Sequence, residues 1–73
     1  MTAGEHAILS IFRRYSVDAN QMLFIHNGDT TKLSPPQFDN AMESLISSGL
    51  VGKDRRRNSY YLTTAGYEAV AAG

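Results

Sequence analysis

Apolar side chains near the start of the chain recur at the spacing i, i+3, i+4, i+7, which places them on one face of a helix. These residues are Ile8, Ile11, Phe12 and Tyr15. Arg13 and Arg14 fall in the last turn of such a helix, where cations complement the helix dipole. The pattern predicts a first helix from about Ala3 to Tyr15, with the four apolar residues facing the core.

The next apolar segment is too short for its period to be decisive. Gln21 to Ile25 is an almost continuous apolar run, and over this length periodicity does not separate a helix from a strand. Asp18 is a suitable N-cap, so we predict a short helix over Ala19 to Ile25. The alternative is a short strand, if Val17 pairs with a later hairpin. His26 to Asp29 then reads as a turn.

The clearest start signal in the sequence precedes the third predicted helix. Ser34 at the N-cap and Gln37 three residues later form a capping box, and Pro35 stands at the first helical position. Gly49 suits the left-handed position just beyond the helix. The apolar face comprises Phe38, Ala41, Met42, Leu45 and Ile46. The opposite face comprises Gln37, Asp39, Asn40, Glu43, Ser44 and Ser47.

After this helix the pattern changes from a helical period to alternation. Leu50 to Asp54 and Ser59 to Thr63 are predicted to be the two strands of a hairpin, with Arg55 to Asn58 as its loop. Alternation places Tyr60 and Leu62 on one side of the second strand and Tyr61 on the other.

A final short helix is predicted up to about Ala71, capped by either Thr63 or Thr64. The expected fold class is therefore α+β: three N-terminal helical elements, a two-stranded β-hairpin and a short C-terminal helix. The 73 residues leave room for one domain, residues 1–73. A single core of this size rarely supplies more than about 3–5 kcal/mol of net stability.

Composition argues against catalysis and against metal binding. There is no cysteine, which excludes disulfides and thiolate ligands. His6 and His26 lie far apart without paired carboxylates, so we expect surface residues rather than ligands. No serine stands in a nucleophile elbow or a triad, and no general acid–base pair can be named. We expect no enzyme activity, no catalytic residue, no cofactor and no metal.

The sequence also carries no targeting signal that we can identify. Met1 to Glu5 lacks the basic and apolar regions of a signal peptide. No apolar stretch approaches the roughly 20 residues that a membrane span needs. We expect a soluble, cytoplasmic protein with no membrane contact.

Charge is balanced overall but not locally. Seven cations and seven acids give a formal net charge of zero. Four of the cations lie within five positions: Lys53, Arg55, Arg56 and Arg57. The acids are spread along the chain. Three adjacent arginines exceed what the solubility of a hairpin tip requires, which favours phosphate contact. The alternative is a solvated tip that keeps the strand edges from pairing with other chains.

Two stretches resemble a known family. Leu45 to Val51 reads Leu-Ile-Ser-Ser-Gly-Leu-Val, and Tyr61 to Glu68 reads Tyr-Leu-Thr-Thr-Ala-Gly-Tyr-Glu. With the basic loop between them, they resemble the recognition-helix ending and the segment after the wing in winged helix-turn-helix proteins. Those proteins include MarR- and PadR-type regulators and small phage or bacterial winged-helix proteins. The resemblance spans Ser34 to Glu68, about half of the chain.

This resemblance implies a small DNA-binding protein, a transcriptional or prophage regulator whose partner is double-stranded DNA. The third helix would enter the major groove and the wing would contact the backbone. The implied base-reading residues are Gln37, Asn40, Ser44 and Ser47. The implied wing contacts are Lys53, Arg55, Arg56 and Arg57.

Other functions remain open from the residues themselves. Asp39 and Glu43 lie on the face that would approach DNA, where they would repel phosphates. The alternatives are a protein–protein interaction module without DNA binding, and sequence-independent nucleic-acid binding through the wing alone. Tyr60 and Tyr61 can stack on single-stranded bases, although we expect at least one of them in the core. The short last helix offers little apolar area, so we expect a monomer or a weak homodimer.

Overall fold

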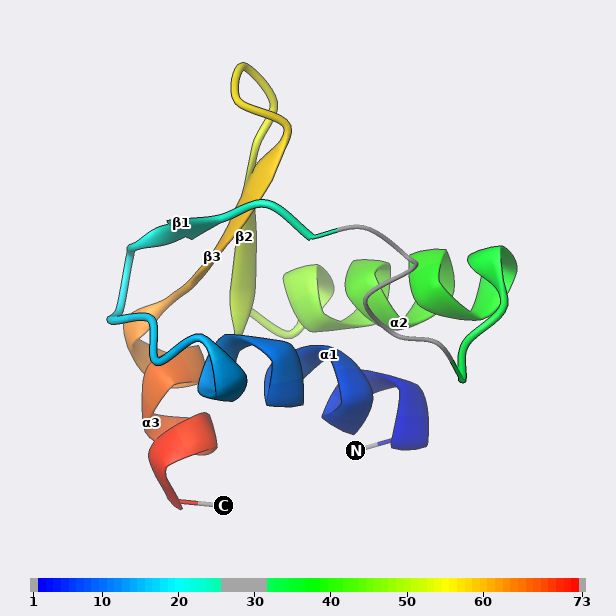
Figure 1. Cartoon of the computed structure of the whole chain (residues 1–73), viewed down its shortest axis with the longest axis horizontal. Coiled ribbons are helices and arrows are strands. Elements are labelled where there is room, and N and C mark those ends of the chain that lie inside the picture. The colour runs from blue at the N-terminus through cyan, green and yellow to red at the C-terminus, as the bar shows by residue number, and fades with distance from the viewer. Residues whose placement is uncertain (1, 26–31, 73) are drawn as a thin grey trace.

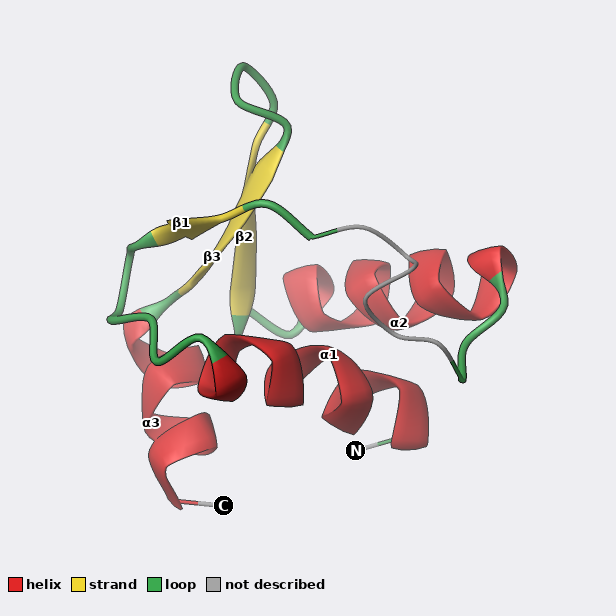
Figure 2. Ribbon diagram, viewed as in Figure 1, coloured by secondary structure: helices red, strands yellow, loops and turns green. Residues whose placement is uncertain are grey.

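The computed structural model describes residues 2–25 and 32–72. Within them three helices and a three-stranded antiparallel sheet are arranged as shown in Figures 1 and 2. The helices are α1 (Ala3–Arg14), α2 (Pro35–Ser47) and α3 (Thr64–Ala72). The strands are β1 (Met22–Leu23), β2 (Val51–Asp54) and β3 (Ser59–Leu62), in the sheet order β1-β3-β2. The prediction of an α+β fold is confirmed.

Helix α1 begins at a capping box that involves Thr2 and Glu5. Ile8, Ile11 and Phe12 are buried, as predicted from their spacing. The placement of Tyr15 in the core was wrong, because its side chain is 55% exposed. The helix ends at Arg14, and Tyr15 is its C-cap residue, so the apolar stripe stops one turn earlier than the sequence pattern.

Helix α2 begins and ends where the sequence predicts. The Gln37 N–H donates to Ser34 Oγ at 3.3 Å, and the Ser34 N–H donates to Gln37 Oε1 at 2.8 Å. Gly49 follows the C-cap with φ +77°, in the left-handed region. One apolar assignment was wrong: Ile46 is 38% exposed. It lies eight residues after Phe38, which rotates it about 80° from Phe38 and places it beyond Met42, at the edge of the buried stripe.

The predicted short helix over Ala19 to Ile25 was wrong. Asn20 adopts φ 67°, which interrupts any helix, and its N–H donates to the Leu62 carbonyl at 2.7 Å. Met22–Leu23 then pairs with β3 as a short strand. The alternative of a short strand is therefore correct, but the residues that pair with the hairpin are Met22–Leu23 and not Val17. Val17 is buried in the core instead.

The segment before β1 shows why the helix does not form. Asp18 does not cap a helix; it closes a turn in which the Gln21 N–H donates to the Asp18 carbonyl at 3.1 Å. The Gln21 side chain accepts from the Asp18 N–H at 2.9 Å. The described residues before the hairpin hence contain two helices and a strand, where three helical elements were expected. The sheet has three strands where two were expected. The predicted turn at His26 to Asp29 lies outside the described residues.

The β2–β3 hairpin and α3 form as predicted, and Thr63 joins them to α2. Thr63 Oγ1 accepts from the Gly66 N–H at 3.0 Å and donates to the Gly49 carbonyl at 2.6 Å. Thr63, and not Thr64, therefore caps α3. A Cβ at Gly66 would collide with the Leu50 carbonyl oxygen, so α3 can approach the residue before β2 this closely only with glycine at this position.

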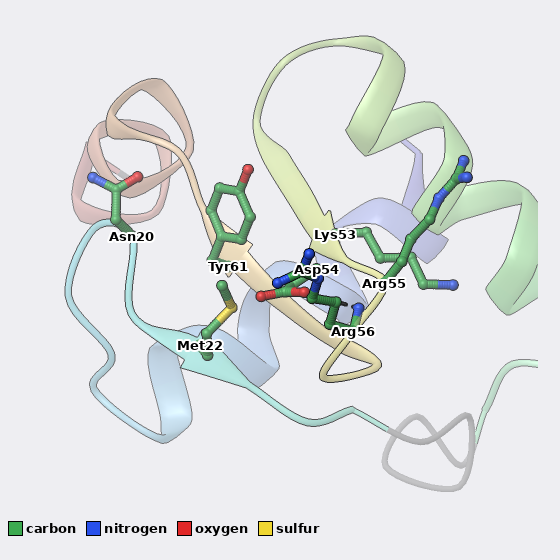
Figure 3. A pocket seen from close by; sticks show the side chains of 7 residues that line it. All are labelled: Asn20, Met22, Lys53, Asp54, Arg55, Arg56 and Tyr61. Atoms are coloured by element: carbon green, nitrogen blue, oxygen red, sulfur yellow. Dashed lines mark hydrogen bonds between the residues drawn. The ribbon is translucent and has the colours of Figure 1, made fainter.

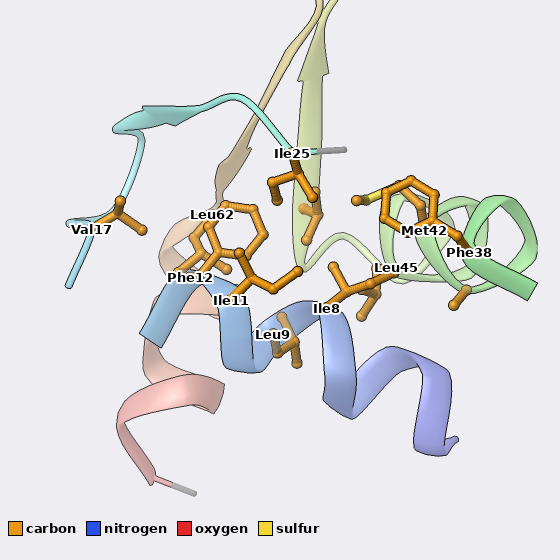
Figure 4. Close-up of a cluster of buried hydrophobic side chains, with 12 residues drawn as sticks. Ile8, Leu9, Ile11, Phe12, Val17, Ile25, Phe38, Met42, Leu45 and Leu62 are labelled. Atoms are coloured by element: carbon orange, nitrogen blue, oxygen red, sulfur yellow. The ribbon is translucent and has the colours of Figure 1, made fainter. Parts of the chain in front are cut away.

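The core lies between α1, α2 and one face of the sheet (Figure 4). Its largest fully buried side chains are Phe12, Ile8, Ile11, Leu45, Leu62 and Val51. Val51 pairs with Leu62, so both project from the same face of the hairpin. Their strand neighbours Gly52 and Tyr61 project from the opposite face. We call this opposite side, which also carries Met22, the outer face of the sheet.

Candidate nucleic-acid interface

The hairpin tip is held in a defined turn by Asp54. Its Oδ1 accepts hydrogen bonds from the backbone N–H of Arg56 at 2.9 Å and of Arg57 at 3.3 Å. Asn58 adopts φ 49°, a left-handed conformation that asparagine tolerates. Ser59 Oγ donates to the Arg57 carbonyl at 3.0 Å and closes the turn. The backbone of the basic segment is therefore fixed by local hydrogen bonds.

Four basic side chains project from this hairpin, and all four are exposed. They are Lys53, Arg55, Arg56 and Arg57. The only acid among residues 53–57 is Asp54, so four positive charges and one negative charge leave a formal local charge of +3. Arg57 Nε lies 3.9 Å from Asp54 Oδ2, but the Arg57 side chain is 72% exposed. Such an exposed pair leaves the arginine available to an anionic partner. In Figure 1 the tip of the hairpin stands clear of the three helices.

The cations of the hairpin do not all lie on one side. Lys53 pairs with Tyr60 and shares its face, and Lys53 Nζ lies 5.6 Å from the centroid of the Tyr60 ring. This contact is within the range of a cation–π interaction. Tyr60 packs against the core cluster, as expected for at least one of the two adjacent tyrosines. Figure 3 shows Lys53 and Arg55 pointing away from Tyr61. The hairpin thus presents a Lys53 side and a Tyr61 side.

The four residues predicted to read bases are all exposed on α2. Gln37 is committed to the capping box through both its side chain and its N–H. Asn40 makes no side-chain hydrogen bond within the described residues. Gln37, Asn40 and Ser44 line a depression of about 330 Å³ beside the N-terminus of α1. Ser47 is not part of this depression, although its spacing places it one turn beyond Ser44 on the same side of α2.

The exposed side of α2 also carries acids. Asp39 and Glu43 are both exposed there, and the described part of α2 contains no lysine or arginine. Ile46 adds partly exposed apolar surface on the same helix. The molecule therefore presents a basic hairpin and an acidic helix, and these favour different partners.

Glu5 is held at the N-terminus of α1 by its contacts with Thr2. Its carboxylate accepts from the Thr2 backbone N–H at 3.1 Å and from the Thr2 hydroxyl at 2.9 Å. These hydrogen bonds favour the ionised form and lower the pKa of Glu5 below its ordinary value. The side chain is engaged in capping α1, which explains its burial without a functional role.

Sequence reasoning missed a group of residues on the outer face of the sheet. Asn20, Met22 and Tyr61 lie around a depression of about 480 Å³, and four hairpin residues, Lys53, Asp54, Arg55 and Arg56, complete its lining (Figure 3). Because residues 19–25 were predicted to be a helix, Asn20 and Met22 were not expected to lie beside Tyr61. The available signal was Asn20, because asparagine is among the few residues that commonly adopt a left-handed conformation.

Among the described residues no three of the histidine and acidic side chains are grouped so as to hold a metal ion. None of the helices in residues 2–25 and 32–72 has the length and apolar character that crossing a membrane requires. No protein-family model, curated protein or solved structure matches this chain. What it does must be inferred from its own geometry and charge.

Proposed function

We propose that this chain is a winged helix-turn-helix domain that binds duplex DNA and acts by binding rather than by catalysis. In this proposal α2 enters the major groove and the β2–β3 hairpin, the wing, contacts the phosphate backbone. Its cellular role would be that of a small cytoplasmic transcriptional or prophage regulator.

The observation that carries the proposal is the exposed basic hairpin tip. A chain of zero net charge concentrates four cations on one hairpin, three of them on a turn whose backbone is fixed by Asp54. Cations arranged in this way suit phosphate oxygens, because contact with DNA releases counterions from the backbone. The helix–strand order and the β1-β3-β2 sheet are also compatible with a winged helix.

The wing is tested by the salt dependence of binding. Replacing Arg55, Arg56 and Arg57 with alanine should weaken binding to every duplex alike. The slope of log affinity against log salt should flatten by about 0.9 for each phosphate that the variant no longer neutralises. Fluorescence anisotropy with a labelled duplex of mixed sequence measures both effects. An unchanged slope in the triple variant would show that the arginines serve only to solubilise the tip.

Base reading is tested at Asn40, which is exposed and has no capping role. If its amide pairs with adenine N6 and N7, Asn40→Ala should cost about 1–3 kcal/mol on the preferred site. Binding to unrelated duplexes should change little, because it depends on phosphate contacts. If Asn40→Ala lowers the affinity for all duplexes equally, or for none, then α2 does not read the base sequence and any DNA binding depends on the wing alone.

Protein docking through α2 is the second candidate, and the acids of that helix favour it. Asp39→Asn and Glu43→Gln should strengthen nonspecific DNA binding if α2 approaches phosphates, because each change removes repulsion. If α2 instead docks on a protein, the same changes should weaken that complex. Comparing NMR shifts of α2 and hairpin amides on adding duplex, at low and at moderate salt, separates the two functions. Absence of shifts at low salt would favour protein docking.

A further inference from the structure

The outer face of the sheet carries a second candidate surface, which is separate from α2 and continues onto the basic hairpin tip. Its centre is Tyr61, the middle-strand residue paired with Gly52 on one side and with Met22 on the other. The Tyr61 ring lies over Gly52, where a Cβ would collide with it. Because Gly52 has no side chain, the ring can lie flat against β2.

Polar groups of different chemistry surround this ring. Asn20 is exposed, and its side-chain amide makes no hydrogen bond within the described residues. Its backbone is nevertheless fixed, because its N–H donates to the Leu62 carbonyl at 2.7 Å. On the tip side, Arg56 lies with Asp54 at the edge of the same depression, as Figure 3 shows. The Asp54 carboxylate is occupied by the turn, whereas no hydrogen bond or ion pair holds the Arg56 guanidinium in the described residues.

An aromatic ring, an amide and a guanidinium around one depression match the three parts of a nucleotide. A flat ring offers a surface on which any base can stack. An amide can donate to and accept from the edge of a base. A guanidinium pairs with phosphate oxygens. The depression of about 480 Å³ falls within the size range of sites that hold small ligands.

We propose that the outer face of the sheet binds an unpaired nucleotide of single-stranded nucleic acid, with the base stacked on Tyr61, Asn20 at the base edge and Arg56 on the phosphate. A paired base does not fit this role, because both of its faces are stacked within the duplex. The positive hairpin tip beside the site favours a strand over a free nucleotide, since further phosphates along the strand can reach Arg55 and Arg57. The site does not depend on base reading by α2.

The test compares binding of a short single-stranded oligothymidylate with binding of a mixed duplex, by fluorescence anisotropy at one low salt concentration. Tyr61→Leu should weaken single-strand binding by about fivefold or more, the loss expected when one base no longer stacks on an aromatic ring. Tyr61→Phe should bind as the unchanged protein does, because it keeps the ring. Tyr67→Leu is the matched control, since Tyr67 is an exposed tyrosine on α3, away from the hairpin tip, and should have no effect.

A second substitution guards against a folding defect at Tyr61. Asn20→Asp retains an exposed residue that tolerates the left-handed conformation, but it places a negative charge beside the site. It should weaken single-strand binding, and NMR shifts on adding the oligonucleotide should fall on Asn20, Met22 and Tyr61. Single-strand affinity that stays within twofold in both Tyr61→Leu and Asn20→Asp, or shifts confined to α2, would overturn the proposal. Mononucleotide binding as tight as strand binding would overturn the assignment to a strand.

Failure of this site can be distinguished from failure of the duplex proposal. Glu43→Gln changes α2, none of whose residues line the depression, and should raise duplex affinity while leaving single-strand affinity unchanged. Higher duplex affinity in Glu43→Gln, together with lower single-strand affinity in Tyr61→Leu, would support two separate surfaces. If each of these two variants keeps the ratio of single-strand to duplex affinity of the unchanged protein, the two nucleic acids share one electrostatic surface and the second site is overturned.

Discussion

At the scale of single residues, the N-terminus of α2 depends on the reciprocal hydrogen bonds of Ser34 and Gln37. Ser34→Ala should lower the free energy of unfolding by about 1 kcal/mol, because a helix N–H loses its acceptor. Urea denaturation followed by circular dichroism measures the change. Ser47→Ala is the control: its hydroxyl makes no hydrogen bond in the described residues, and alanine is the better helix former. An equal loss in both variants would contradict a specific capping role.

Glu5 gives the stability of the chain a dependence on pH. Its pKa in the folded chain is lowered from an ordinary value of 4.5 by the hydrogen bonds of Thr2. A group with a depressed folded-state pKa stabilises fully above its unfolded pKa, and that contribution is lost as the pH falls through the folded pKa. The melting temperature should therefore fall below about pH 4.5.

Thr2→Ala tests the part of this effect that comes from the Thr2 hydroxyl, since the backbone N–H of residue 2 is retained. Without the hydroxyl that bonds to the carboxylate, the melting temperature should fall less steeply over the same acid range. Melting curves of both proteins across that range provide the comparison. Parallel curves would show that the Thr2 hydroxyl does not contribute to the acid sensitivity.

At the scale of elements, sequence patterns were sufficient to predict the elements whose hydrogen bonds join residues close together in the chain. The capping box and Gly49 predict both ends of α2, and the change of period predicts the hairpin. Strand β1 is different, because it exists through pairing with β3, far along the chain. No pattern within residues 19–25 reports that partner, so the apolar run was assigned to a helix.

The same distinction applies to the candidate site. Exposure of the hairpin cations and of the polar face of α2 follows from local patterns and was predicted. Two features depend on tertiary structure and were not predicted. They are the position of Gln37 and Ser44 beside α1, and the position of Asn20 and Met22 in one depression with Tyr61.

The hairpin tip offers a prediction at this scale, because the Asp54 carboxylate accepts hydrogen bonds from the turn and also places a negative charge among the arginines. Asp54→Asn keeps an oxygen that can accept from the N–H groups of Arg56 and Arg57, but removes the negative charge. Its duplex affinity at low salt should rise. Asp54→Ala removes the acceptor as well and should loosen the turn. Anisotropy titrations of both variants at two salt concentrations separate the effects, and lower affinity in Asp54→Asn would contradict a phosphate-binding tip.

At the scale of the whole molecule, one small core must support every element. Leu45 is fully buried where α2 meets the rest of the core. Leu45→Ala should cost about 2–5 kcal/mol, whereas the total stability of a chain of this size rarely exceeds about 3–5 kcal/mol. A large unfolded fraction at room temperature is therefore expected by circular dichroism and NMR. Ile46→Ala, at the neighbouring exposed position, should remain folded; equal losses at both positions would contradict the assigned core.

The shortness of β1 has a consequence for how the molecule opens. A two-residue edge strand can detach without unfolding the core, whereas β3 lies between two strands and is released only with the hairpin. Backbone amides of Asn20 and Leu23 should exchange with deuterium through such local opening, well before those of Tyr60 or Leu62. Hydrogen exchange followed by NMR measures the difference. Equal protection along β1 and β3 would mean that this edge opens only when the whole domain unfolds.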